Sequence, residues 1–301
     1  MDPDVNRADA VAREFDCKAF GSIEQLITTH SEVQAASVAV PTAHHLGTSR
    51  KLMEAGVDVL IEKPLAASLF EADELLTLAQ RFKRIVQVGH LERFNPAVRA
   101  ALPLITRPMF FEVHRLSVFS PRSLDVDVVL DLMIHDLDIV LTFVNSRVKE
   151  IRAVGLPILS SKVDIANVRM EFESGCVANF TASRVSTERV RKVRFFQPKQ
   201  YISIDYGRQD VLVFSVDGAS VSSSGSFSPS VNPQIGVEKP AIVAEEPLRA
   251  ELRSFLDAVR TRSKPLVSLA EGRRALAVAL DIVTAIQEHS EAADLQSLST
   301  R

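Results

Sequence analysis

The first hundred residues alternate between short apolar runs and segments whose apolar side chains recur at helical spacing. The apolar runs cover residues 35–40, 57–61 and 85–88. They predict buried strands, because strands of parallel sheets are hydrophobic on both faces. Helical spacing predicts helices over 44–55 and 68–81, between these strands. Strands that alternate with helices at this interval predict a parallel sheet with helices on both faces.

The pattern changes in the second half of the chain. Short segments with period-two alternation follow one another from residue 148 to about 221, separated by turns such as Glu173-Ser174-Gly175. They predict one large, open, mainly antiparallel sheet. Residues 110–118 alternate only weakly, and we expect an edge strand or a domain-crossing strand there. Three apolar helices are predicted as well, over residues 127–144, 248–260 and 271–288. We expect all three to cover one face of this sheet.

The fold class predicted from these patterns is therefore α/β followed by α+β. A length of 301 residues indicates two domains, since a domain has roughly 150 residues. We place the first domain at 1–97, with the partial parallel sheet. The second, at 98–301, holds the large sheet and is expected to bind substrate and form subunit contacts.

Composition and charge exclude several classes of partner. The chain is 46% hydrophobic and 24% charged, with a net charge of −3. This balance gives no electrostatic basis for binding nucleic acid or a membrane surface, and no apolar stretch reaches the roughly 18 residues of a membrane span. Cys17 and Cys176 are the only cysteines. Two isolated cysteines and the absence of a signal or transit peptide favour a reducing cytoplasm.

The helix predicted over 127–144 carries the strongest candidates for catalysis. Asp127, Asp131, His135 and Asp138 recur three or four residues apart, so they share one stripe of an otherwise apolar helix. A neutral His can act as a general base near pH 7, and a nearby carboxylate can hold its tautomer. The alternatives are a buried structural network, an acidic cluster at the N-terminus of the helix and, more weakly, a metal site. No second His or Cys lies at ligand spacing, and we predict no metal.

Polar residues also follow each predicted strand of the first domain, where open α/β sheets bind ligands. Glu62-Lys63-Pro64 closes the second strand. Lys63 can bind a substrate hydroxyl and polarise the developing carbonyl, while Glu62 can hold Lys63 or bind a nicotinamide carboxamide. Pro41-Thr42 closes the first strand and starts a helix whose N-terminus suits a phosphate or ribose. For each motif the alternative is an ordinary surface loop.

A third cluster, from Gly89 to Pro96, follows the last of these strands. Gly89 allows a close approach of the backbone. Arg93 can bind anionic or hydroxyl-rich ligands, and Asn95 can bind hydroxyls. The alternative is a loop that links the domains. The basic stretch 184–199 contains six Lys or Arg residues within predicted strands, and we interpret it as a solvated sheet face or a subunit contact.

The order of these motifs resembles the Gfo/Idh/MocA family of sugar dehydrogenases. The motifs are Pro41-Thr42, Glu62-Lys63-Pro64, Arg93-Phe94-Asn95-Pro96 and Asp131-(three residues)-His135-Asp136-(one residue)-Asp138. The resemblance implies a Rossmann domain, NAD or NADP as cofactor, and removal of hydride from a ring hydroxyl of a sugar or cyclitol. It implies that Lys63 and His135 flank the substrate with Asp131 as the accompanying carboxylate, and that His90, Arg93 and Asn95 bind the substrate.

The variant of these motifs looks most like members that oxidise the 3-hydroxyl of UDP-N-acetylglucosamine. Glycines that are usual before and within the Asp-to-His segment are replaced by Val128, Val129, Leu130 and Met133. The resemblance also favours a homo-oligomer formed through the open sheet.

The family's first motif, a strand that ends in GxGxxG, is absent from this chain. Met1 to Asp4 looks like the end of the second strand of such a domain, with Asp2 where the family binds the adenosine ribose. The other expected cofactor contacts are Pro41, Thr42, His45, Glu62 and Lys63. We expect weak cofactor binding and impaired activity from a chain without this motif. The alternative is a non-catalytic sugar-binding or oligomerisation protein that has lost its cofactor site.

Overall fold

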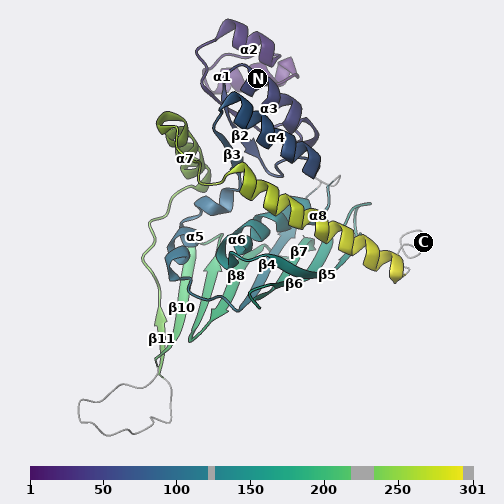
Figure 1. The fold of residues 1–301 in the computed structure, drawn as a ribbon, viewed down its shortest axis with the longest axis vertical. Coiled ribbons are helices and arrows are strands. Elements are labelled where there is room, and N and C mark those ends of the chain that lie inside the picture. Colours follow the sequence, from purple (N-terminus) through teal and green to yellow (C-terminus); the bar gives the residue numbers. More distant parts are fainter. Residues whose placement is uncertain (121–125, 218–233, 294–301) are drawn as a thin grey trace. The chain divides into compact units, whose positions relative to one another are not determined.

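The computed structural model describes residues 1–120, 126–217 and 234–293. Their contacts divide the chain into two compact units (Figure 1). The first unit comprises residues 1–90 and 251–273, and the second comprises residues 91–250 and the chain from Arg274 onward. The division predicted from the sequence left residues 251–273 in the second domain.

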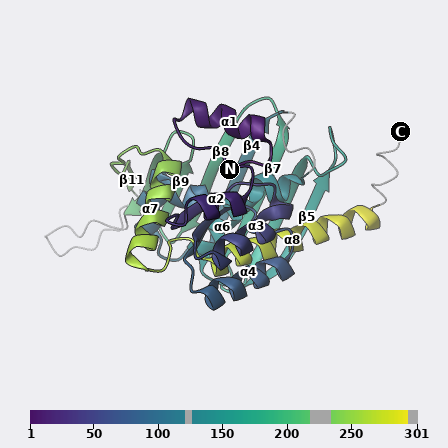
Figure 2. The same ribbon diagram turned by 90° about the horizontal axis from the view of Figure 1, so that it is seen from above.

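The first unit is built on the predicted parallel sheet, in the order β1-β2-β3. The strands are β1 (Ala35–Val38), β2 (Asp58–Glu62) and β3 (Val86–Gly89). Its helices are α1 (Val5–Glu14), α2 (Ile23–Thr29), α3 (His45–Glu54) and α4 (Leu69–Phe82), with a short 3-10 turn, η1, at Thr42–His44. Helices α3 and α4 pack side by side (Figure 2). All three predicted strands form, and β3 and most of β2 are buried as predicted. In β1 only Val38 is buried, because this strand lies at the edge of the three-stranded sheet.

Helix α7 (Pro247–Thr261) explains why residues 251–273 belong to the first unit. Phe255 and Val259 on α7 are buried against Leu60 of β2. The expectation that this helix covers the second sheet is therefore wrong for its C-terminal part. Its strong amphipathic pattern showed that one face is buried, but a pattern cannot tell which sheet covers that face. None of the described helices is both long and apolar enough to cross a bilayer.

The second unit is built on an eight-stranded sheet, in the order β11-β10-β9-β8-β4-β7-β6-β5. The strands are β4 (Phe110–Val118), β5 (Val148–Leu156), β6 (Ile165–Phe172), β7 (Val177–Ser186), β8 (Val190–Gln197), β9 (Gln200–Asp205), β10 (Asp210–Asp217) and β11 (Gln234–Glu238). Only β4 and β7 run parallel, and all other neighbours are antiparallel. The predicted, mainly antiparallel sheet is confirmed, although β11 was not predicted.

Strand β4 lies between β7 and β8, inside the sheet. The expectation of an edge strand over 110–118 is therefore wrong. Phe111, Val113 and Arg115 all face the interior and are buried. The alternation looked weak because the third of these inward positions holds an arginine.

Helices α6 (Ile134–Val144) and α8 (Leu269–Ala292) cover one face of this sheet (Figure 1). Beneath them Phe111, Phe143 and Phe195 form an aromatic cluster. The ring of Phe195 stacks on Phe111 at 5.3 Å and meets Phe143 edge-on at 5.7 Å. Smaller helical segments precede the sheet, namely η2 (Leu91–Phe94), α5 (Pro96–Ala101) and η3 (Leu102–Leu104).

The helix predicted over 127–144 has an irregular beginning. Residues Val129–Met133 form a turn of π-helix, labelled η4, and α6 follows it directly. A π-turn adds a residue to the normal helical repeat, and such turns are frequent at functional sites. The residues before and after it therefore do not share one stripe in the way that α-helical spacing predicts.

We predict that Phe195→Ala destabilises the second unit by about 3–5 kcal/mol, the usual effect of removing a core aromatic side chain. The neighbouring residue Phe196 points to the opposite, open face and is 38% exposed. Phe196→Ala should cost about 1 kcal/mol or less. Urea denaturation followed by circular dichroism compares the two variants, and equal effects would contradict the alternation of β8.

Candidate functional site

Glu62 ends β2 and lies opposite Gly89 of β3 in the parallel register. A Cβ atom at position 89 would lie 2.9 Å from Oε2 of Glu62 and 3.2 Å from its Cα. A glycine is therefore required for the close approach of the two strand ends, as the sequence predicts. Burial raises the pKa of Glu62, partly offset by a hydrogen bond from the Lys63 backbone and by the charge of Lys63.

His45 ties the ends of two strands together in the first unit. It is buried, with Nδ1 3.0 Å from the Pro64 carbonyl and Nε2 2.9 Å from the Val40 carbonyl. Val40 follows β1, and Pro64 belongs to the motif after β2, next to Lys63. Carbonyl oxygens accept hydrogen bonds only, so a ring nitrogen that carries a hydrogen donates to the carbonyl beside it. These bonds favour a supporting role for His45 over direct contact with a cofactor.

A cavity of about 760 Å³ runs along β1 in the first unit. Asp2 and Pro41, both predicted to contact a cofactor, line it together with residues 36–40, which comprise most of β1 and the two residues after it. The Asp2 carboxylate accepts a hydrogen bond from the Asp4 backbone and pairs with Arg7 at 3.6 Å. Thr42 opens the short turn η1 that leads into α3.

Lys63 is half-buried directly after β2. His90, the last residue of the first unit, is buried, and its backbone N–H donates to the Val88 carbonyl at 2.9 Å. The cavity along β1 and these strand ends belong to the same unit, the first. The chain contains no GxGxxG loop that would hold a pyrophosphate at a helix N-terminus.

In the second unit, the segment η2 is fixed to α6 by an ion pair. Arg93 Nε donates to Asp138 Oδ2 at 2.8 Å, and both side chains are largely buried. Asn95 caps α5 by accepting from the Ala97 backbone at 3.0 Å, and its amide donates to Glu92 and to the Tyr206 carbonyl. These bonds favour structural roles for Asn95 and Asp138.

Arg115 of β4 is the centre of a buried charged network in the same unit. Its Nε donates to Asp136 Oδ2 at 2.6 Å, and its Nη2 donates to Asp136 Oδ1 and to Glu92 Oε1, both at 3.0 Å. The ring of Tyr206 lies 5.2 Å from the guanidinium carbon. Burial acts to lower the pKa of Arg115, but the charge and hydrogen bonds of Asp136, with Glu92, raise it well above its usual range.

This network was not predicted from the sequence. The signal that could have identified it is the period-two pattern of β4, which places Arg115 on the same face as Phe111 and Val113. An arginine at an inward position requires carboxylate partners. Glu92 and Asp136 both lie within the motifs described above.

The acidic stripe predicted on the helix is divided by the π-turn. Asp127 Oδ1 accepts from the Val163 backbone at 3.0 Å, so this residue holds a loop. Asp131 lies in the π-turn and His135 in the first turn of α6, and both are half-buried. Asp136, next to His135, is anchored to Arg115. Lys63 belongs to the first unit, and Asp131 and His135 belong to the second.

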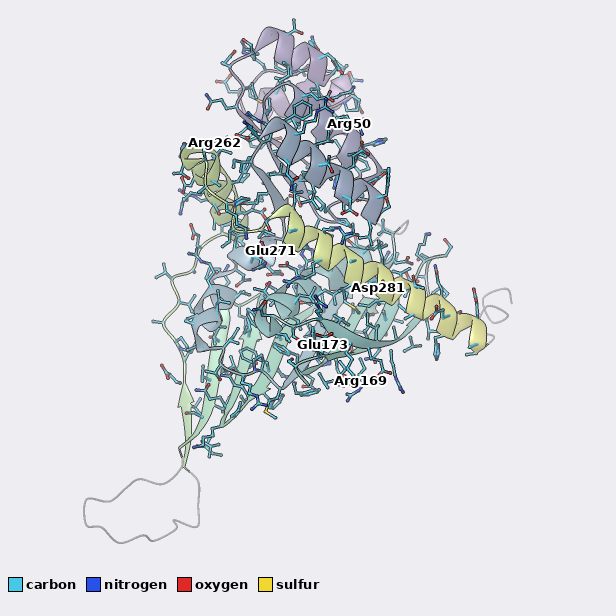
Figure 3. All side chains as sticks on the ribbon, viewed as in Figure 1. Arg50, Arg169, Glu173, Arg262, Glu271 and Asp281 are labelled. Atoms are coloured by element: carbon cyan, nitrogen blue, oxygen red, sulfur yellow. The ribbon has the colours of Figure 1, made fainter. Side chains whose placement is uncertain are left out.

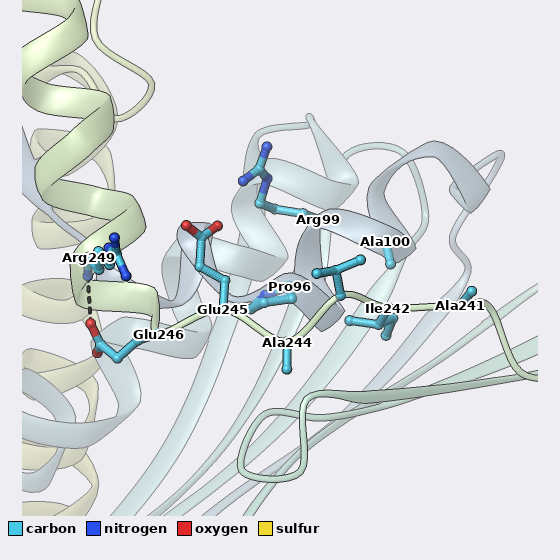
Figure 4. A pocket seen from close by; sticks show the side chains of 10 residues that line it. Pro96, Arg99, Ala100, Ala241, Ile242, Ala244, Glu245, Glu246 and Arg249 are labelled. Atoms are coloured by element: carbon cyan, nitrogen blue, oxygen red, sulfur yellow. Dashed lines mark hydrogen bonds between the residues drawn. The ribbon is translucent and has the colours of Figure 1, made fainter.

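A further cavity of about 770 Å³ lies in the second unit, between α5 and residues 241–249 (Figure 4). Arg99, Glu245 and Arg249 are among the residues that line it, and none of the predicted site residues does. Within the part of the chain that the structure describes, no group of three or more His, Cys, Asp or Glu side chains could hold a metal ion.

Two family models match the chain. Residues 1–90 match the oxidoreductase family with an NAD-binding Rossmann fold, and residues 110–202 match the GFO/IDH/MocA C-terminal domain. Each match falls within one of the two units. The matches agree with the fold class predicted from the sequence.

The chain is similar to the UDP-N-acetylglucosamine 3-dehydrogenase of Acidithiobacillus ferrooxidans. It is 35% identical over 288 residues, which cover 95% of this chain and 88% of that protein. A solved structure of that enzyme matches with a TM-score of 0.85, again over 95% and 88% of the two chains. An inositol dehydrogenase homologue from Azotobacter vinelandii, complexed with NADH and myo-inositol, shares the fold at a TM-score of 0.80 with 16% identity, over 96% and 86% of the chains.

We predict that Arg115→Met destabilises the second unit by about 3–5 kcal/mol, because Asp136 and Glu92 would remain buried without their cation. Adding Asp136→Asn should recover part of the loss, since the amide carries no charge. Arg152→Met is the matched control, because Arg152 pairs with Glu150 at the surface and its loss should leave the denaturation midpoint unchanged. A single Arg115→Met variant as stable as the parent would refute the central role of this network.

Proposed function

Because this chain belongs to the Gfo/Idh/MocA family of NAD-binding oxidoreductases, we propose that it oxidises the 3-hydroxyl of UDP-N-acetylglucosamine or a closely similar nucleotide sugar. The observation that carries this proposal is the 35% identity to a UDP-N-acetylglucosamine 3-dehydrogenase over 95% of the chain. The ordered motifs that contain Lys63, Asp131 and His135 support the same reaction type.

In the proposed reaction, His135 is the general base that takes the proton from the sugar hydroxyl. Lys63 binds the same oxygen and stabilises the negative charge that develops on it. Asp131 holds His135 in the tautomer that accepts the proton. When bound, NAD or NADP supplies the hydride acceptor. The half-buried positions of Lys63, Asp131 and His135 suit groups that must meet a ligand and still be partly desolvated.

We propose that Asp2, Pro41, Thr42, Glu62 and Lys63 contact the cofactor. The cavity along β1, which Asp2 and Pro41 line, supports this assignment. His45 positions the Glu62-Lys63-Pro64 motif, because its ring nitrogens contact the Pro64 carbonyl and the Val40 carbonyl. We keep Arg93, which forms a largely buried pair with Asp138, in the proposed substrate-binding set, together with His90, three residues before it in the sequence.

We also propose that the protein is a cytoplasmic homo-oligomer. The two cysteines are free thiols, which suits a reducing compartment. On the open face of the sheet the rings of Phe110, Phe196, Tyr201 and Phe214 follow one another at centroid distances of 5.7, 4.8 and 5.2 Å. A second copy of the chain is the proposed partner for this aromatic row, while Arg169 on the same face is surrounded by polar residues (Figure 3).

We predict that His135→Asn lowers turnover with UDP-N-acetylglucosamine by about 10²–10⁴-fold, the usual effect of losing a positioned base, and changes KM only a few-fold. The absorbance of the reduced nicotinamide measures the rate. His114→Asn is the control, because His114 lies on the open face of β4. A turnover of the His135 variant within a few-fold of the parent would assign the base to another residue.

We predict that this 301-residue chain binds NADH and NADPH more weakly than micromolar, because it has no glycine-rich loop for the pyrophosphate. The chain contains no tryptophan, so nicotinamide fluorescence can be titrated without energy transfer from protein indoles. Micromolar binding would show that the β1 cavity suffices for the cofactor. Sugar binding without any cofactor binding would favour the non-catalytic alternative.

A further inference from the structure

Arg191 differs from the other basic residues of its strand. Along β8, Val193 and Phe195 face the covered side of the sheet and are fully buried. Arg191 has the same parity and lies on that covered face, whereas Lys192 and Arg194 point to the open face. The interpretation of this stretch as a solvated sheet face therefore holds for Lys192 and Arg194 but not for Arg191, which is half-buried.

One of the cross-strand neighbours of Arg191 is another arginine. Arg115 of β4 is directly opposite in the antiparallel register, a position at which Cβ atoms lie about 4.5–5.5 Å apart and like charges destabilise the pair. Asp136 and Glu92 both bond to Arg115, so the two nearby carboxylates are already engaged. The fold thus places a second cation next to one that is already paired.

Among the residues that the structure describes, no acceptor forms a hydrogen bond or ion pair with the guanidinium of Arg191. A guanidinium carries five N–H donors, and no nitrogen of Arg191 is among the fully buried polar atoms without a partner, so water or a ligand can reach these donors. Burial, and then the charge of Arg115, lowers the pKa of Arg191, although an arginine remains protonated in proteins. An anionic ligand would give this second cation and its N–H donors a partner.

We propose that Arg191 binds a phosphate group of the substrate, which in the proposed function is the diphosphate of the nucleotide sugar. A planar guanidinium matches phosphate oxygens in a bidentate manner, and a neutral sugar offers no such group. The position fits, because Arg191 is directly opposite Arg115, and Arg115 bonds to Asp136, the residue after His135. This inference rests on the proposed function for the identity of the ligand as a nucleotide sugar. That the ligand carries a phosphate group is argued from Arg191 itself.

Isothermal titration of the full chain tests the proposal with three probes, namely UDP-N-acetylglucosamine, UDP and inorganic pyrophosphate. Arg191→Gln should weaken binding of each by about 10- to 100-fold, the range for hydrogen bonds to a charged group. Arg194→Gln is the matched control, because Arg194 lies on the same strand but on the open face, 3.4 Å from Glu112. Its affinity should equal that of the parent.

The thermal denaturation midpoint separates recognition from folding. Arg191→Gln removes a like charge beside Arg115, so it should unfold at the same temperature as the parent or higher. A loss of affinity together with unchanged or raised stability supports a binding role. A lowered midpoint with unchanged affinity would overturn it, as would equal losses in the Arg191 and Arg194 variants.

The probes also separate this inference from the proposed function. If UDP-N-acetylglucosamine is oxidised and its KM is unchanged in Arg191→Gln, the proposed function stands and the inference fails. If pyrophosphate binding depends on Arg191 but no nucleotide sugar is oxidised, the anion site stands and the proposed substrate is wrong. NADH binding should be equal in parent and variant, and a loss confined to NADH would refute a substrate site. The inference also fails if the parent binds none of the three probes at millimolar concentration.

Discussion

The charge on Arg115 must be balanced inside the second unit, and much of the local structure follows from that requirement. Its two carboxylate partners come from η2 and α6, which are separated by about forty residues of sequence that include β4 itself. Satisfying one guanidinium therefore fixes the orientation of α6 over the sheet and holds η2 beside it. The second ion pair, between Arg93 and Asp138, joins the same two elements. Asp131 lies in the π-turn before α6, and His135 lies in the first turn of α6. The ion pairs that anchor α6 therefore also fix the positions of these two residues.

A buried ion pair is an expensive way to join two elements, because hydrophobic contacts of similar volume are often as stable or more so. What an ion pair adds is geometry, since a bidentate guanidinium–carboxylate contact allows one arrangement of the two groups. The aromatic cluster of Phe111, Phe143 and Phe195 supplies the non-directional part of the packing between the same sheet and helix. The combination holds the helix that carries His135 in one orientation over the sheet.

The sequence predicts most strands of both sheets, because continuous apolar runs and strict alternation are direct consequences of burial on two faces or one. It fails where a buried position holds a polar side chain, as at Arg115, which hid the central place of β4. It also fails where a helix departs from the regular repeat, as at Val129–Met133. The sheet against which α7 packs could not be predicted, since the apolar side chains of Phe255 and Val259 could be buried against either sheet. Among the candidate site residues, the motifs show which side chains cluster, but not which atoms they bond. His45 lies next to backbone carbonyls, Asn95 caps a helix and Asp138 forms an ion pair, and residue type alone does not predict these partners.

The alternation of β8 has a consequence for how this protein can change over evolutionary time. Phe195 on one face belongs to the core, Phe196 on the other belongs to the open aromatic row, and Arg191 shares its parity with the core residues. Insertion or deletion of a single residue within the strand would exchange the two faces and move every one of these side chains to the wrong side. New ligand preferences at position 191 can therefore arise by substitution alone. The turns on either side of β8 can vary in length, but β8 itself can change only by substitution of residues, without insertion or deletion.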